Sequence, residues 1–240
     1  MTDAKLLPII WTLASMVIAV LITLIFSPAR ADRFRSTLAG RLLEHIFRLI
    51  YFIGLPYAAL LTHSLSAVDL GFMGNSGSNE AAVFGWTSAD WLRGLSTGLT
   101  LGLIVLIPIG LAARQMARAG SPLGVDVRSA GSIAIDSVYS EAHWAFYRSA
   151  PLILLGSAYG AALIGLLLVS IELVVAMVRN GLGTQPEDRQ SWIGQALLLA
   201  MSATTFILTR NVWLAIALHM VIEVALKAIT TRLAAHMKIA

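Results

Sequence analysis

Cysteine is absent from the 240-residue chain. Its absence excludes disulfides, thiolate nucleophiles, cysteine zinc sites and iron–sulfur clusters. Charge is also scarce, because only 12% of residues are charged, against about a quarter in soluble domains. Hydrophobic residues make up 58% of the chain, and its mean hydropathy is +0.80. This composition excludes a soluble globular protein and predicts an integral membrane protein.

Several sequence motifs that indicate a particular function are missing as well. The sequence contains no nucleotide-binding loop, no cluster of metal ligands, no Ser-His-Asp arrangement and no arginine ladder of a voltage sensor. The net charge is +4, but the basic residues lie in short segments between apolar runs rather than in a patch or stripe. We therefore interpret the charge as a signal of topology and expect no nucleic-acid partner.

Apolar runs of about 20 residues, the length of helix that crosses a bilayer, dominate the chain. Six are clear, and they are Leu6 to Phe26, Leu42 to His63, Leu92 to Ala113, Pro151 to Val178, Trp192 to Leu208, and Val212 to Ile229. A seventh segment, Ser129 to Ala150, is long enough to span although it contains Asp136, Glu141, His143 and Arg148.

The positions of the basic residues decide whether this polar segment crosses, because Lys and Arg near helix ends prefer the cytoplasmic side. The loop before the second run is rich in arginine, Ser64 to Trp91 has no basic residue, and the next loop again has arginines. If the polar segment spans the membrane, the Arg179/Arg189 loop and the basic C-terminal tail also lie on the cytoplasmic side. We therefore predict an all-α bundle of about seven spans with the N-terminus out and the C-terminus in. It forms a single transmembrane domain over residues 1–240, in the cytoplasmic (inner) membrane.

Small residues repeat at spacings that let helices approach closely. We expect them to serve packing within this chain. They are Gly94, Gly98 and Gly102 in the third run, and Gly156, Gly160 and Gly165 in the fourth.

Ionisable side chains inside a membrane cost roughly 2.5–3.5 kcal/mol each, so each needs a partner or a purpose. Glu141 and Arg148 are seven residues apart on nearly one helix face, with Trp144 between them, which predicts a shared polar stripe. They either take part in chemistry or only neutralise one another. His219 and Glu223 are one helical turn apart, so the carboxylate can orient the imidazole.

These residues carry a family resemblance. The segment Arg210-Asn-x-Trp-Leu, followed by His219-x-x-x-Glu223 and preceded by the Glu141…Arg148 helix, resembles the CAAX prenyl protease and bacteriocin-processing (CPBP) family of membrane proteins. The resemblance covers about residues 129–228. It implies a glutamate-type intramembrane protease, in which a glutamate activates water and histidine and Asn groups stabilise the oxyanion.

The sequence departs from the family pattern at several positions. Adjacent glutamates are replaced by Ser140-Glu141 or by Glu141-Ala142, Arg148 lies seven rather than four residues after the carboxylate, and the terminal Asn or Asp is Glu223. The middle histidine is missing, because no histidine lies between residues 143 and 219. Losing one oxyanion donor typically costs 10²–10³ in rate. We therefore expect a degenerate, non-catalytic member of the family.

Three functions follow as hypotheses. The first is a non-catalytic subunit of a larger membrane complex. Sequences of this degenerate type are similar to ones from filamentous phototrophic bacteria, which implies an accessory subunit of a photosynthetic reaction-centre and light-harvesting core, stabilising it or flanking a quinone passage. Its partners would be membrane lipids and other transmembrane subunits, with lipid, quinone or bacteriochlorophyll and carotenoid at the surface. His45, near the start of the second run, is the candidate ligand of a chlorin magnesium.

The second hypothesis is a protease that uses Glu141 as base, Arg148 as its partner, and His219 with Glu223 at the oxyanion or water. The third is a small-molecule transporter. It rests on polar groups inside the apolar runs, which are Asp136, Glu141, Arg148 and Glu172.

Overall fold

The computed structural model describes residues 3–25, 34, 36–74, 82–118, 128–179 and 186–237. Over these residues the chain is all-α, with an isolated β-bridge between Val83 and Trp86 and no strand, which confirms the predicted fold class. The helices form seven continuous stretches. They are α1 (Asp3–Ile25), the joined helices α3 (Leu38–Leu49), η1 (Ile50–Gly54) and α4 (Leu55–Leu61), α5 (Ser88–Arg118), α6 (Ala130–Leu155), α7 (Ala158–Arg179), α8 (Pro186–Thr209) and α9 (Val212–Met237).

Four of the described helices are long and apolar enough to cross a membrane, so the chain is a multi-pass membrane protein. The segments concerned are Leu6–Thr23 in α1, Ser88–Gln115 in α5, Ala158–Val178 in α7 and Val212–Leu233 in α9. The shorter apolar segment Gly194–Thr209 belongs to α8. The count of seven spans and the orientation of the termini stay predictions.

One predicted boundary is wrong. The fourth apolar run was expected to begin at Pro151, but α6 continues through that proline to Leu155, and α7 begins only at Ala158. Gly156 causes the break, because it adopts φ +64°, a left-handed conformation that favours glycine. Its N–H donates to the carbonyl oxygen of Leu152 at 2.8 Å and so caps the end of α6.

The chain divides into two compact units, and α6 contributes to both. The first unit contains α1, the α3–η1–α4 stretch, the part of α6 from Tyr139 onward, and α7. The second contains α5, the first turns of α6, α8 and α9. The single transmembrane domain stays a prediction.

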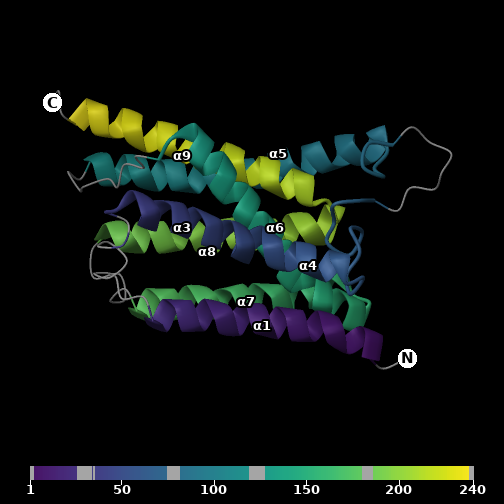
Figure 1. Cartoon of the computed structure of the whole chain (residues 1–240). Helices are drawn as coiled ribbons and strands as arrows, with labels where there is room; N and C mark the ends of the chain where they lie inside the picture. Colours follow the sequence, from purple (N-terminus) through teal and green to yellow (C-terminus); the bar gives the residue numbers. More distant parts are fainter. Residues whose placement is uncertain are drawn as a thin grey trace. The chain divides into compact units, whose positions relative to one another are not determined.

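In the first unit, α1 and α7 lie side by side (Figure 1). The segment of α6 that follows Tyr139 is buried, with Phe146 and Tyr147 wholly inaccessible. It approaches α7 closely at Gly165, where an added Cβ would lie 2.6 Å from Cγ of Arg148 and 3.3 Å from its backbone. The glycine thus allows a long charged side chain to pack against α7, as predicted for this position.

In the second unit, α5 packs along α9 (Figure 1). Two of the predicted packing glycines face that helix. A Cβ added to Gly94 would lie 2.1 Å from Cδ1 of Leu214, and one added to Gly102 would lie 3.3 Å from Cδ1 of Leu218. The prediction fails at Gly98, whose Cβ would meet nothing within 4 Å.

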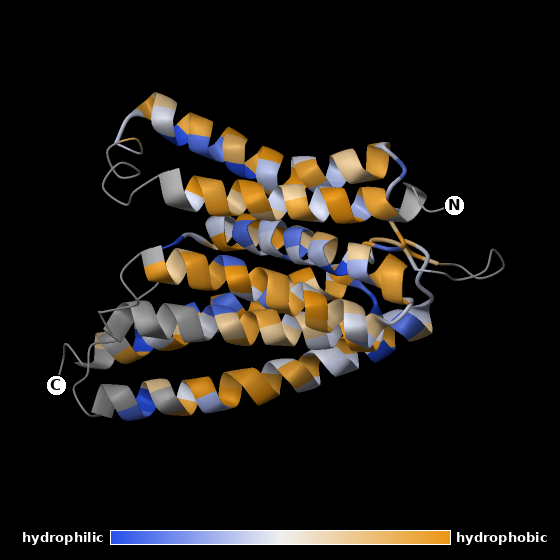
Figure 2. Ribbon diagram, turned by 90° about the horizontal axis from the view of Figure 1, so that it is seen from below, coloured by the Kyte–Doolittle hydropathy of each residue, from blue (hydrophilic) through white to orange (hydrophobic). Residues whose placement is uncertain are grey.

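The long helices are largely apolar, as the orange stretches of ribbon in Figure 2 show, and many of their large apolar side chains are exposed. On α1 most of the exposed side chains follow one face at helical spacing, and these are Leu6, Ile10, Leu13, Val17 and Leu21. Such a face suits lipid tails or apolar helices of other chains.

Candidate functional site

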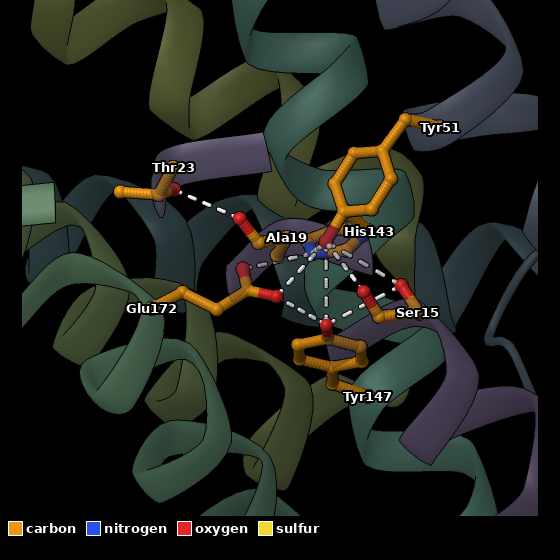
Figure 3. Close-up of polar contacts among 7 residues, drawn as sticks. All are labelled: Ser15, Ala19, Thr23, Tyr51, His143, Tyr147 and Glu172. Atoms are coloured by element: carbon orange, nitrogen blue, oxygen red, sulfur yellow. Dashed lines mark hydrogen bonds and ion pairs between the residues drawn. The ribbon is translucent and has the colours of Figure 1, made fainter. Parts of the chain in front are cut away.

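Five polar side chains meet inside the first unit, and we call them the polar cluster. They are Ser15 of α1, Tyr51 of η1, His143 and Tyr147 of α6, and Glu172 of α7 (Figure 3). Ser15 and Glu172 lie within two of the helical segments that are apolar enough to span a membrane. The cluster is therefore a polar site inside the membrane-spanning part of the chain.

Local backbone structure places each of these side chains. His143 and Tyr147 are one turn apart and therefore share a face of α6. Tyr51 lies in the π-helical turn η1, where the N–H of Leu55 donates to the carbonyl of Ile50, five residues earlier. Single π turns inside α-helices occur often at functional sites. Here the turn carries the one buried tyrosine of the α3–η1–α4 stretch.

The Glu172 carboxylate is the centre of the cluster and accepts hydrogen bonds on both oxygens (Figure 3). The Tyr51 hydroxyl donates to Oε1 at 2.9 Å, and the Tyr147 hydroxyl donates to the same oxygen. Nε2 of His143 lies 3.1 Å from Oε2. Three donors from two other helical stretches thus satisfy an acidic group that would be costly in a membrane if left alone.

The other contacts connect the cluster into one network. The Tyr51 hydroxyl lies 3.4 Å from both Nε2 of His143 and the Tyr147 hydroxyl. Oγ of Ser15 donates to the Tyr51 hydroxyl at 3.5 Å and lies 3.3 Å from that of Tyr147. The His143 ring also packs on the Tyr147 ring, with centroids 4.3 Å apart. These groups can donate, accept and hold protons, which is the chemistry the arrangement offers.

Exposure differs sharply within the cluster. Ser15, His143 and Tyr147 are at most 1% exposed and Tyr51 is 7% exposed, whereas the Glu172 side chain is 16% exposed. Nδ1 of His143 is buried and has no hydrogen-bond partner among the residues that the structure describes. Glu172 is therefore the most exposed member of the cluster.

Glu141 and Arg148, the first predicted pair, form an ion pair in α6. Nη2 of Arg148 lies 3.9 Å from Oε2 of Glu141, and their side chains are 2% and 0% exposed. The shared polar stripe that their spacing predicted is therefore confirmed. Whether either residue is catalytic is not decided by this geometry and stays a prediction.

Glu223, the second predicted carboxylate, belongs to the second unit and bonds Arg128. Nη2 of Arg128 lies 2.9 Å from Oε1 of Glu223, and its Nη1 lies 3.2 Å from Oδ2 of Asp136. The Lys227 ammonium donates to the backbone carbonyl of Arg128. His219 is buried on α9 at 4% exposure. Its orientation by Glu223 stays a prediction.

His45, the candidate ligand of a chlorin, is exposed on α3. That position leaves its imidazole open to lipid or to a partner. Within the described ranges, no group of three or more His, Asp or Glu side chains is placed to hold a metal ion. The ligand role of His45 stays a prediction.

The second unit has a small cavity where α5 begins and α8 meets α9. Its volume is about 60 Å³, and its polar lining includes Asp90 and Asn211. Both side chains already cap helices, because Asp90 accepts from the N–H of Thr87 at 3.1 Å and Asn211 accepts from the N–H of Trp213 at 2.9 Å. These two side chains of the lining are therefore engaged in helix capping.

Sequence reasoning found part of the polar cluster. Glu172 was singled out as a buried acid, and His143 as a polar residue of the seventh segment. Tyr51, Tyr147 and Ser15 were missed, because hydroxyl side chains within apolar runs are equally typical of ordinary packing. The only signal was the position of Ser15 and Tyr51 near the middle of such runs, and Tyr147 lies near the end of its segment.

No family model, no curated protein and no solved structure matches this sequence. The resemblance to the CPBP family therefore stays a prediction that rests on the residues quoted above.

Proposed function

We propose that the protein is a non-catalytic, multi-pass subunit of a larger membrane complex. The observation that supports this most is the buried ion pair of Glu141 and Arg148. A proteolytic glutamate has to reach a water molecule and a scissile carbonyl. The Glu141 side chain is 0% exposed and faces a guanidinium, which suits a structural role.

The remaining residues of the protease hypothesis support the same conclusion. Glu223, which would act at the oxyanion or water, accepts a hydrogen bond from Arg128 at 2.9 Å. An oxyanion site needs hydrogen-bond donors, and a carboxylate offers none when it is ionised. The histidine expected between residues 143 and 219 is missing from the sequence.

The surface of the helices suits assembly. Large apolar side chains are exposed along α5 as well as α1, among them Leu92, Leu95, Leu99 and Leu103. Such faces contact lipid tails or transmembrane helices of partner subunits. We propose membrane lipids and other transmembrane subunits as partners, and the cytoplasmic membrane as the location.

The resemblance suggests a concrete assembly. We propose a photosynthetic reaction-centre and light-harvesting core, in which the chain stabilises the complex or flanks a passage for quinone. The exposed His45 is the residue of choice for a bacteriochlorophyll contact at that surface.

The double variant Glu141→Gln/Arg148→Met tests the non-catalytic proposal in native membranes. It removes both charges of the ion pair, so that no unpaired charge stays buried, and Glu44→Gln on α3 is the control. We expect both proteins to co-purify with the same subunits as the wild type and to leave the pattern of cleaved membrane peptides unchanged. Accumulation of an uncut peptide with the double variant alone would establish the protease hypothesis instead.

A further inference from the structure

Among the described residues, no arginine or lysine side chain contacts the acid of the polar cluster. In the first unit, the described part of α1 from Leu6 to Thr23, the segment of α6 after Tyr139 and α7 up to Val178 contain four acidic, basic or histidine residues, which are Glu141, His143, Arg148 and Glu172. Arg148 faces Glu141 at 3.9 Å. The described partners of Glu172 are two hydroxyl groups and the imidazole of His143.

The side chains of the helices packed around Glu172 are consistent with this distribution of charges. From η1 it receives the Tyr51 hydroxyl, and from α6 it receives Tyr147 and His143. The described side chains of α1 from Leu6 to Thr23 include no ionisable group. Arg48 of α3 stacks over the Tyr139 ring, with its Cζ 5.5 Å from the ring centroid.

An ionised carboxylate inside a membrane is costly unless a positive charge neutralises it. The imidazole is the only group in the cluster that can supply that charge, and it does so by binding a proton. With one bound proton, the pair of Glu172 and His143 is neutral. Without it, the pair keeps one negative charge, which the two tyrosine hydroxyls can only partly stabilise.

We propose that Glu172 and His143 are a proton-binding pair inside the membrane-spanning part of the protein, which takes up and releases one proton. On uptake the proton bonds to the pair, and the imidazole and carboxylate share it across their 3.1 Å contact. On release it returns to water, leaving a neutral imidazole and a carboxylate. This goes beyond the proposed role as a subunit.

Two features of the cluster suit this pair, which are the partial exposure of Glu172 and the two tyrosine hydroxyls that surround it (Figure 3). Glu172 is the most exposed member, with 16% of its side chain accessible, so we expect protons to exchange at this residue. The hydroxyls of Tyr51 and Tyr147, 3.4 Å apart, both contact the pair. We expect these contacts to hold the helices together whether or not the proton is bound.

Infrared difference spectra of the full-length protein in liposomes, taken between acidic and alkaline buffers in H₂O and D₂O, test this proposal. We expect deuterium-sensitive bands of a glutamate carboxyl and of an imidazole to change together. Both should be lost in Glu172→Gln, which keeps an acceptor for the tyrosines, and in His143→Asn. The double variant Glu141→Gln/Arg148→Met, which removes the neighbouring ion pair without leaving a buried charge, should keep them. Bands that persist in Glu172→Gln would overturn the proposal.

A measurement on the wild type covers the case in which these variants do not fold. Nuclear magnetic resonance of protein labelled with ¹³C-glutamate and ¹⁵N-histidine reports both partners, and the Tyr147 ring 4.3 Å away identifies the His143 signals. We expect the Glu172 carboxyl and His143 nitrogen signals to shift over the same pH interval. Signals that shift independently, or not at all, would refute a shared proton.

Discussion

Two acidic side chains of the first unit are neutralised in different ways. Glu141 faces the guanidinium of Arg148, a group that stays charged and suits a permanent structural contact. Glu172 faces two hydroxyls and an imidazole, and the imidazole is a group that can bind or release a proton. Similar carboxylates in one unit thus have separate roles, set by the partners that the fold gives them.

Removing one partner of the Glu141 ion pair should strongly destabilise the protein. Arg148→Met leaves a buried carboxylate without its guanidinium and should lower the free energy of unfolding by about 3–5 kcal/mol. The double variant Glu141→Gln/Arg148→Met should recover most of this loss, because no buried charge remains. Circular dichroism of the unfolding of these variants in detergent gives the free energies of this double-mutant cycle. Equal losses in the single and double variants would show that the pair is not the cause.

Truncating a hydroxyl of the polar cluster should have a smaller effect. Tyr147→Phe removes the donor to Glu172 and should cost about 1.5–3 kcal/mol, the range for hydrogen bonds to charged groups. Tyr139→Phe is the matched control, because the Tyr139 ring stacks on Phe52 with centroids 5.8 Å apart, and that contact survives the change. Equal stability of the two variants would contradict the account of the cluster.

The sequence allowed one of these sites to be predicted and not the other. Glu141 and Arg148 lie on one helix, so their spacing alone brings them together. Tyr51 and Glu172 are 121 residues apart on different helices, and only tertiary packing joins them. No local pattern distinguishes a tyrosine that bonds a buried acid from one that only fills space.

At the scale of helices, the residue at which a helix begins or ends depends on backbone conformation as much as on hydropathy. All seven predicted segments are helical, because apolar runs and the absence of other polar partners favour internal backbone hydrogen bonds. The limit at Pro151 was misplaced, since the glycine conformation at Gly156 ends α6 instead. The π turn η1 was not predictable, because nothing in the composition of Ile50–Gly54 distinguishes a π turn from an α-helix.

Close approach of α6 and α7 should depend on Gly165. In Gly165→Ala the new Cβ meets Arg148 at its Cγ and backbone, so overpacking should cost about 1–3 kcal/mol. Gly98→Ala on α5 is the control, because its Cβ meets nothing within 4 Å and alanine favours helix by about 0.5–1 kcal/mol. Thermal unfolding of both variants gives the comparison. A Gly165→Ala protein as stable as Gly98→Ala would mean that the helices do not need this glycine.

At the scale of the whole molecule, the orientation can be tested cleanly because the chain has no cysteine. Met73→Cys lies in the segment expected outside, and Ala130→Cys lies at the start of α6, expected inside; both positions are exposed. A membrane-impermeant maleimide added to intact cells should label the first and spare the second until the cells are opened. The reverse labelling would contradict the predicted topology.

The central claim is that the chain works as a subunit of a larger membrane assembly. Native mass spectrometry after extraction from native membranes in a gentle detergent tests it most directly. We predict a species larger than the 25.7 kDa chain, in which other transmembrane subunits are present in fixed ratio, with or without bound pigment. A species that contains only the 25.7 kDa chain and lipid would contradict the claim.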